Sequence, residues 1–239
     1  VTLAEDNLSL DGATVTAKEK DNSATTSRMI DKTALDHVQM MNVADVSGLL
    51  PGGATVTPDL TAQQQFNIRA GISGSEAGSS SFGTAVEVDG VRLSNNASFV
   101  SVANEPNGVK GVSTNNIASS NVESVEVITG VPSVEYGDMT SGVVKINTRK
   151  GRTPTNITFS VNPRTYQASV SKGVDLQNDN GVLNLSAEWA RAVKKLVSPY
   201  MSYDRTGVTL SYSNTFARSL RFEAGFAGNL GGMDSMDDP

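Results

Sequence analysis

Side chains that could carry out catalysis or bind a metal are few in this sequence. His37 is the only histidine and there is no cysteine, so a nucleophile–base pair or a metal site has no second histidine or thiolate to use. Glu123 and Glu126 are three residues apart beside an apolar run, where we expect surface side chains rather than a general acid and base. Gly-x-Ser-x-Gly, His-Glu-x-x-His and dinucleotide-binding motifs are missing. We therefore predict no enzyme, no metal site and no cofactor.

The composition narrows the class of protein further. The chain has 239 residues and a net charge of −6, and it contains no basic block that would attract nucleic acid. Charged residues make up 18% of the chain, below the roughly 25% of soluble domains. No apolar run approaches the ~20 residues of a transmembrane helix. Transmembrane β-strands need only ~10 alternating residues each, so they remain compatible with this sequence.

The most informative stretch covers residues 122–151. It begins with a β-branched run, continues through a turn-rich segment and ends with a second apolar run: Val122-Glu123-Ser124-Val125-Glu126-Val127-Ile128, Glu135-Tyr136-Gly137-Asp138 and Gly142-Val143-Val144-Lys145-Ile146-Asn147-Thr148. Alternation and β-branching favour strands, and glycine favours breaks between them. These residues alone predict a strand, a compact loop and a second strand.

As an ordered string, the same stretch resembles the end of the plug domain of TonB-dependent outer-membrane receptors. In that family an I-E-S-I-E-V strand precedes a G-P-x-x-x-x-Y-G loop and a G-x-V-x-I-x-T-x-x-G strand. The matching positions are residues 122–127, Gly130, Tyr136-Gly137 and residues 142–151, with Val131 placed before Pro132. The resemblance implies an α+β plug domain followed by the first antiparallel strands of a transmembrane β-barrel of about 22 strands.

Three upstream segments also resemble that family. Residues 42–50 predict a short helix with Asn42 as its N-cap, and the family has a helix followed by L-P-G at this place. Residues 65–71 resemble the family's strand that ends in I-x-I-R-G. Asp89-Gly90 lies between two apolar runs and suits a type I′ hairpin turn, where the family has a V-x-V-D-G-V hairpin.

The resemblance further implies a binding segment near the start of the chain. This extended segment looks like the Ton box, which adds a strand to the periplasmic energy-coupling protein TonB through backbone hydrogen bonds. An ordinary leader is the alternative interpretation. The residues expected to bind TonB are Leu10, Asp11, Thr14, Val15 and Thr16.

Other site residues follow from the resemblance. Arg69 and Arg149 would lock the plug in the barrel. In the family, an arginine at the position of Arg69 pairs with acidic residues of the barrel wall. A buried guanidinium needs such partners; a solvated arginine at a strand end is the alternative for Arg69. Asn95, Asn96 and Phe99 lie in a loop that would rise toward the extracellular side and touch a substrate. A surface loop without ligand contact is the alternative.

From residue 155 onward the pattern changes to repeated alternation. Apolar residues alternate with polar or small ones, as in outer-membrane strands that face lipid on one side and the lumen on the other. A soluble five-stranded sheet with one buried face gives the same pattern, and the plug resemblance favours the barrel. Trp189, Tyr200 and Tyr203 would suit an interfacial aromatic girdle. The five segments are residues 156–161, 166–171, 183–190, 208–213 and 220–226.

These patterns divide the chain into three parts. They are a Ton-box-like segment at 1–20, a plug at 21–152 with a linker and first strand over 21–36, and five barrel strands at 153–239. Because a plugged barrel needs about 22 strands, we expect the chain to be the N-terminal part of a longer polypeptide. The expected location is the bacterial outer membrane, with the plug inside the barrel and a periplasmic N-terminus.

The function implied by the resemblance is energy-coupled uptake of a substrate that the sequence does not identify. The expected partners are TonB and outer-membrane lipid, and a surface lipoprotein is a further candidate. The alternative function keeps the plug and barrel as a non-transporting scaffold, or as a component of a surface protein complex.

Overall fold

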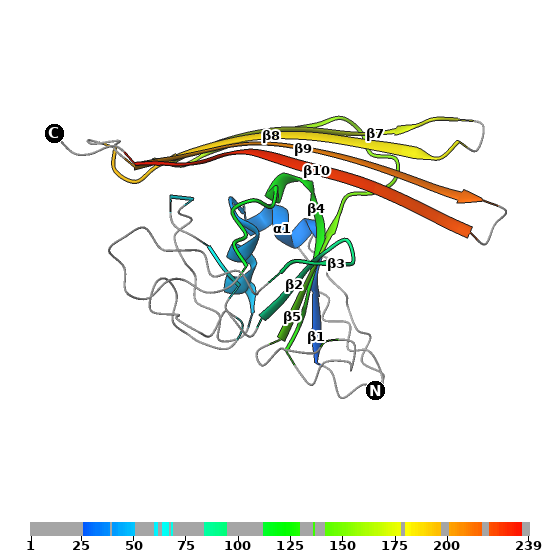
Figure 1. Cartoon of the computed structure of the whole chain (residues 1–239), viewed down its shortest axis with the longest axis horizontal. Coiled ribbons are helices and arrows are strands. Elements are labelled where there is room, and N and C mark those ends of the chain that lie inside the picture. The colour runs from blue at the N-terminus through cyan, green and yellow to red at the C-terminus, as the bar shows by residue number, and fades with distance from the viewer. Residues whose placement is uncertain are drawn as a thin grey trace, which may run out of the picture.

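The computed structural model contains two five-stranded β-sheets with short helices beside them (Figure 1). One sheet belongs to an N-terminal domain, and the other, which we name the wall, extends over that domain. None of the helices in the described part of the chain is long and apolar enough to cross a membrane. The structure describes residues 26–38, 40–50, 60–61, 64–66, 68, 84–94, 112–129, 136, 142–177, 180–196, 201–216 and 220–235.

The sheet of the N-terminal domain is mixed, with the strand order β1-β4-β5-β2-β3. Its strands are β1 Ser27–Ile30, β2 Thr84–Val88, β3 Val91–Arg92, β4 Val122–Ile128 and β5 Gly142–Thr148. β2 pairs in parallel with β5, whereas β4 and β5 pair antiparallel. The strand, loop and strand predicted for residues 122–151 are therefore confirmed as to both strands, which lie next to each other in the sheet.

Backbone geometry confirms two local predictions. Asp89 and Gly90 have φ angles of 51° and 82°, the positive values that a type I′ turn requires, and they join β2 to β3. The helix predicted for residues 42–50 is the 3₁₀-helix η1, Val43–Leu49. Its N-cap Asn42 accepts a hydrogen bond from the Ala44 amide at 2.8 Å, and Asp45 accepts one from the Asn42 amide at 2.9 Å. These reciprocal bonds form a capping box.

One helix of this domain differs from the sequence prediction. A linker and a strand are expected over residues 21–36; the strand is confirmed as β1, but helix α1, Lys32–Val38, follows it. Asp31 caps this helix by accepting a hydrogen bond from the Ala34 amide at 2.9 Å. Ala34 and Leu35 are buried in the domain core. A helix this short is not stable alone, so its packing against the sheet decides its formation.

The core of the N-terminal domain lies between the helices and one face of the sheet. A smaller apolar cluster of Ala85, Ile128 and Val143, with Tyr136 packed against it, covers the other face. Burial on both faces explains why β4 and β5 carry more apolar residues than simple alternation provides. The main core includes Ile30, Leu35, Val43, Val46, Phe66, Val86, Val125, Val127, Val144 and Ile146.

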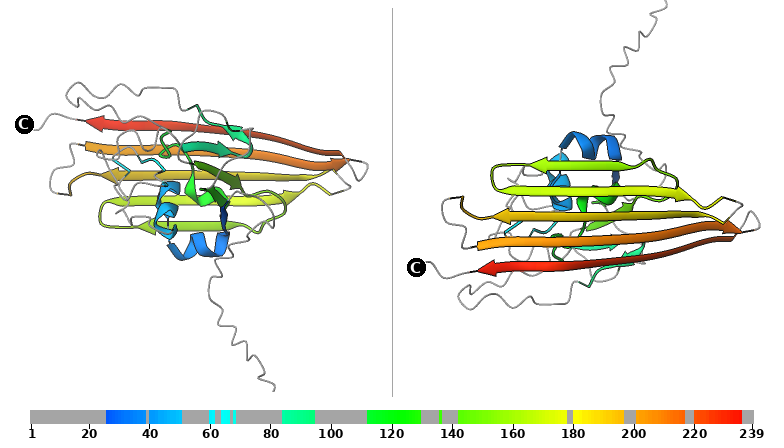
Figure 2. Two further views of the ribbon diagram at one scale, coloured as in Figure 1. Left: turned by 90° about the horizontal axis from the view of Figure 1, so that it is seen from below. Right: turned by 90° about the horizontal axis from the view of Figure 1, so that it is seen from above.

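The wall is an antiparallel meander in which each strand pairs with the next in the chain. All five segments predicted from alternation lie within strands. Figure 2 shows these strands side by side, with the helices of the N-terminal domain on one face of the wall. The strands are β6 Asn156–Val161, β7 Thr165–Asp175, β8 Val182–Val193, β9 Met201–Phe216 and β10 Leu220–Ser235.

The two faces of the wall have opposite chemistry. The buried face against the N-terminal domain carries polar side chains, among them Thr165, Gln167, Ser186, Glu188 and Arg205. A soluble sheet would bury its apolar face instead, so this arrangement is that of a barrel wall with a polar lumen. The outer face carries exposed large apolar side chains, including Ile157, Phe159, Val161, Tyr166, Val170, Leu185, Trp189, Val208, Leu210, Phe222 and Phe226.

The position of Tyr203 corrects one sequence prediction. Tyr203 was expected in an outer aromatic girdle, but its side chain is buried on the inner face and its hydroxyl donates to the Asn115 carbonyl oxygen at 3.0 Å. The physical reason is that a phenol group near a strand end can satisfy its hydroxyl at either face. Trp189 does lie on the outer face, and Tyr200 is outside the described residues.

The close packing of Gly142 in β5 against β4 predicts a larger effect for its substitution than for that of Gly90, which lies in the open β2–β3 turn. A Cβ on Gly142, which has a φ of 149°, would lie 2.4 Å from the Ile128 carbonyl oxygen, whereas a Cβ on Gly90 meets no atom within 4 Å. We expect Gly90→Ala to cost about 1 kcal/mol of backbone strain, and Gly142→Ala about 2 kcal/mol more. Amide hydrogen exchange of β4 and β5 measures the difference. Equal exchange in the two variants would contradict this account of the close approach.

Candidate functional site at the contact between the N-terminal domain and the wall

The N-terminal domain meets the wall through residues 112–121, which we name the contact segment. It includes the 3₁₀-helix η3, Ser119–Asn121, directly before β4. Figure 1 shows this green segment rising from the domain to the inner face of the wall. The segment carries only neutral side chains, so every charge at this contact comes from the wall.

The centre of the contact is an ion pair between two wall residues. Arg205 on β9 donates from Nη2 to Glu188 on β8, and each side chain is only 1% exposed. Arg205 Nη1 also donates to the carbonyl oxygens of Asn115 and, at 3.3 Å, of Ile117. Glu188 accepts hydrogen bonds from the amide of Ser120 at 3.2 Å and from its hydroxyl. Two charges can remain buried here because each is paired and hydrogen-bonded.

Neutral polar groups extend the contact around this ion pair. Two neutral donors of the wall, Tyr203 and Asn229, bind main-chain carbonyls of the contact segment, which fixes its backbone path along the wall. The bonds join Gln167 Nε2 to Ser119 Oγ at 3.1 Å, Tyr203 Oη to the Asn115 oxygen at 3.0 Å, Asn121 Nδ2 to Thr209 Oγ1 at 3.1 Å and Asn229 Nδ2 to the Asn116 oxygen at 2.6 Å.

Asn115 connects the wall contact to the interior of the N-terminal domain. Its side-chain oxygen accepts from Asn42 Nδ2 at 3.0 Å and from the Gln64 amide at 3.1 Å. Its Nδ2 donates to the Leu60 carbonyl oxygen at 3.2 Å. The main-chain oxygen of the same residue accepts from Arg205. Asn115 therefore links the cap of η1, Leu60, Gln64 and the wall.

Arg149, predicted to lock the domain to the wall, makes a weaker contact than the prediction implies. Its Nε lies 3.7 Å from the Glu123 carboxylate of the same domain, and its Nη1 donates to Ser171 Oγ on β7 at 3.5 Å. The buried ion pair involves Glu188 and Arg205 instead, and the sequence reasoning did not single out either residue. The sequence signal that could have found them is that Glu188 and Arg205 are charged residues at inward positions of their strands, where most neighbours are small or uncharged.

The remaining predicted site residues lie outside the described part of the chain, and their roles stay predictions. His37 is described and occupies the last turn of α1. Among the described residues, no three His, Cys, Asp or Glu side chains lie close enough together to hold a metal ion. The residues outside the described part are Leu10, Asp11, Thr14, Val15, Thr16, Arg69, Asn95, Asn96 and Phe99.

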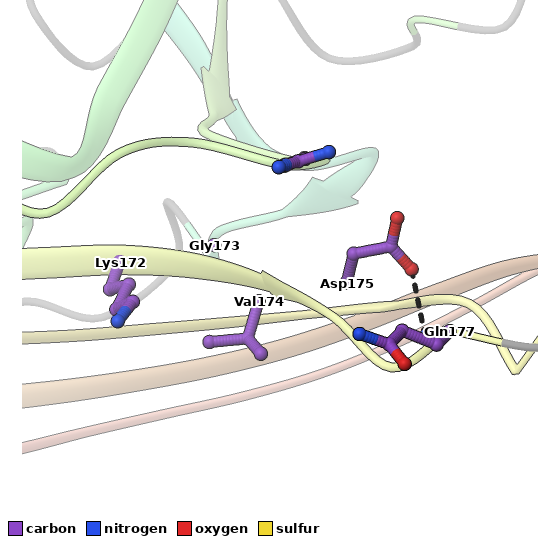
Figure 3. A pocket seen from close by; sticks show the side chains of 6 residues that line it. Lys172, Gly173, Val174, Asp175 and Gln177 are labelled. Atoms are coloured by element: carbon purple, nitrogen blue, oxygen red, sulfur yellow. Dashed lines mark hydrogen bonds between the residues drawn. The ribbon is translucent and has the colours of Figure 1, made fainter.

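A shallow pocket of about 320 Å³ lies at the C-terminal end of β7, away from the contact segment. It is lined by residues that include Arg152, Lys172, Asp175 and Gln177. Lys172 points to one side of the strand and Asp175 to the other (Figure 3). Asp175 accepts a hydrogen bond from the Gln177 amide at 2.9 Å. Because its charged groups do not converge, the pocket does not form a defined ligand site.

The burial of the ion pair predicts a large effect when one partner is removed. Arg205→Met leaves Glu188 charged and buried, and we expect a loss of about 3–5 kcal/mol in the stability of the contact. The double variant Arg205→Met/Glu188→Gln should lose less, because it removes both charges. Hydrogen exchange of residues 112–121 measures both effects.

Arg191 and Asp204 offer a matched control on the same two strands. Their charged groups lie 3.9 Å apart, and both side chains are about half exposed. Exposed pairs contribute about 0–1 kcal/mol, so Arg191→Met should leave exchange of the contact segment unchanged. Equal effects of Arg191→Met and Arg205→Met would show that the inner pair is not the centre of the contact.

Solved structures of receptors share this arrangement of a domain and a wall. The siderophore receptor PirA from Acinetobacter baumannii matches with a TM-score of 0.62 at 17% identity, over 87% of this chain and 32% of that chain. A mutant of the ferric enterobactin receptor PfeA from Pseudomonas aeruginosa, in complex with enterobactin, matches with a TM-score of 0.54 at 19% identity, over 85% and 33%. At these identities the likeness shows the fold, and the chain spans about a third of the length of those receptors.

Comparison with protein families assigns the N-terminal domain. No curated protein sequence matches the chain. Residues 18–144 match the family model described as TonB-dependent Receptor Plug Domain. The match covers more than half of the 239 residues and includes all five strands of the mixed sheet except the last part of β5. The chain therefore belongs to the TonB-dependent receptor family, with the N-terminal domain as its plug and the wall as the first strands of its barrel.

Proposed function

We propose that this chain supplies the plug and the first barrel strands of a receptor for energy-coupled uptake across the bacterial outer membrane. The observation that carries the proposal is the chemistry of the wall, which buries polar side chains against the plug and exposes apolar ones outward. Apolar side chains on the outer face suit lipid. Polar side chains on the inner face suit a lumen that water fills when the plug moves.

The plug contact also suits a plug that moves. Separation of an apolar interface would expose apolar area to water at about 25 cal/mol per Å², whereas water can replace the neutral hydrogen bonds of the contact segment. Glu188 and Arg205 both belong to the wall, so they remain paired when the plug leaves. The separation therefore leaves neither charge alone, and a permanent scaffold would have no need for this property.

The proposed partners and sites extend this function. Leu10, Asp11, Thr14, Val15 and Thr16 bind TonB by strand addition in this proposal. Arg69 and Arg149 help to lock the plug, and Asn95, Asn96 and Phe99 contact the substrate. PirA and PfeA are named as receptors for siderophores or ferric enterobactin, so a ferric siderophore is the first substrate class to test.

The TonB contact can be tested with a peptide of residues 7–20 and the periplasmic domain of TonB in a calorimetric titration. We expect the native peptide to bind and Val15→Pro to abolish binding, because proline removes a backbone donor from the added strand. Val15→Ala keeps that donor, so it is the matched control and should bind within a few-fold of the native peptide. If the native peptide does not bind, the Ton-box assignment is wrong and the non-transporting scaffold becomes the leading function.

A further inference from the structure

The covalent connection between plug and wall is short and forms a tether. β5 ends at Thr148 and β6 begins at Asn156, so residues 149–155 are the tether that every movement of the plug relative to the wall must involve. This tether has an end fixed to the wall, a charged clasp at Lys150 and a glycine joint at Gly151. Together they suggest how the plug is held at its base.

The wall end of the tether is fixed against β7. The Gly173 amide donates to the Thr153 carbonyl oxygen at 3.1 Å. A Cβ on Gly173 would lie 2.3 Å from the Gly151 carbonyl oxygen and 2.6 Å from the Thr153 nitrogen. Figure 3 shows Gly173 on this part of β7. Only a glycine lets the tether approach the strand this closely, so the Gly151 carbonyl group and Thr153 stay with the wall.

The plug end of the tether carries the charged clasp. Lys150 Nζ lies 2.7 Å from the Glu223 carboxylate on β10 and 3.4 Å from that of Asp89 in the β2–β3 turn. Asp89 also accepts hydrogen bonds from the Thr148 amide at 3.0 Å and from its hydroxyl at 2.6 Å. One ammonium group therefore joins the β2–β3 hairpin and the end of β5 to the wall.

The charge on Lys150 is maintained by these partners. Partial burial lowers the pKa of Lys150, but the Glu223 hydrogen bond and the charge of Asp89 outweigh it, so the pKa is raised above its ordinary value. Burial and geometry set the strength of the clasp. Each of the three side chains keeps about a third of its surface exposed, so water and salt reach the ion pairs and weaken them. Such a clasp can open without disturbing the buried contact at Arg205.

A joint lies between the clasp and the fixed end. Gly151 has a φ of 89°, and a Cβ there would meet no atom within 4 Å. The glycine is thus required by backbone conformation rather than by crowding. We infer that the tether is a hinge. The plug base pivots at Gly151, and the clasp at Lys150 holds it closed by joining Asp89 to Glu223. This inference concerns the resting receptor and does not depend on which substrate it carries.

Hydrogen exchange of the full-length receptor tests the clasp. Lys150→Gln should raise exchange in residues 84–92 roughly two- to fivefold, the range of an exposed ion pair, and leave residues 112–121 unchanged. High salt should give the same rise in the native protein and none in the variant. Arg221 is the matched control, because it lies 2.5 Å from Glu223 and contacts no described plug residue through an ion pair. Arg221→Gln should change nothing in residues 84–92.

Distance measurements between spin labels test the hinge separately. Labels on Val91→Cys in β3 and Leu220→Cys in β10 report the position of the hairpin relative to the wall, and both native side chains are exposed. The distance distribution should broaden with Lys150→Gln and stay narrow with Lys150→Arg, which keeps the charge. If hydrogen exchange in residues 84–92 and the distance between the spin labels are both unchanged in Lys150→Gln, the proposed role of the clasp is wrong. An equal rise of exchange in residues 112–121 would also overturn it, since that result indicates general destabilisation.

Discussion

The structure depends on a buried pair of charges in the wall that bind the backbone of the plug. Arg205 and Glu188 lie on neighbouring strands, and each also forms hydrogen bonds with the contact segment. A buried charge must be paired to be tolerated, and here the pairing is complete within the wall. The plug contributes carbonyls, an amide and a hydroxyl, which are groups that water can also satisfy. The wall therefore holds the plug in a defined position without sharing a charge with it at this contact.

The same constraint explains the chemistry on both sides of the wall. The inward positions that meet the contact segment must offer hydrogen-bonding groups, because this segment presents main-chain oxygens and hydroxyls that cannot be buried without partners. Ala190 and Ala192, also inward, instead pack with Leu60 of the plug. Asn115 carries this requirement into the plug, where its amide completes the bonding of Asn42 and Gln64. Outward positions do not meet the plug, and most of their large side chains are apolar, with Arg191 and Asp204 as a charged exception. A sheet that buries polar groups and exposes apolar ones is stable only with lipid outside, which agrees with the family of the chain.

Two of the contacts between the plug and the wall differ in physical character. The contact segment is buried and made of neutral groups against a self-paired wall, whereas the clasp at Lys150 is partly exposed and uses charges from both bodies. Separation at the clasp leaves Asp89 and Glu223 without their shared ammonium, but their exposure lets water and salt compensate. The two attachments therefore respond to different conditions, and one can open while the other holds.

The sequence by itself determined the elements whose signals are local. Alternation located all five wall strands, Asp89-Gly90 specified its turn through positive φ angles, and Asn42 specified the start of η1 through its side-chain bond. The ordered string at residues 122–151 indicated the family without any tertiary contact. Each of these signals lies within a few residues, so no distant partner is needed to interpret it.

Only the tertiary structure decided what each face of the wall meets. Alternation shows which residues share a face, but it does not show which face is covered, and for this reason Tyr203 was expected on the outer face although its side chain lies inside. Helix α1 is too short to form without the sheet. Arg205 and Asn115 are 90 residues apart in the chain, and Ser120 and Glu188 are 68 apart. Contacts of that separation arise from the packing of the plug on the wall, which no local pattern encodes.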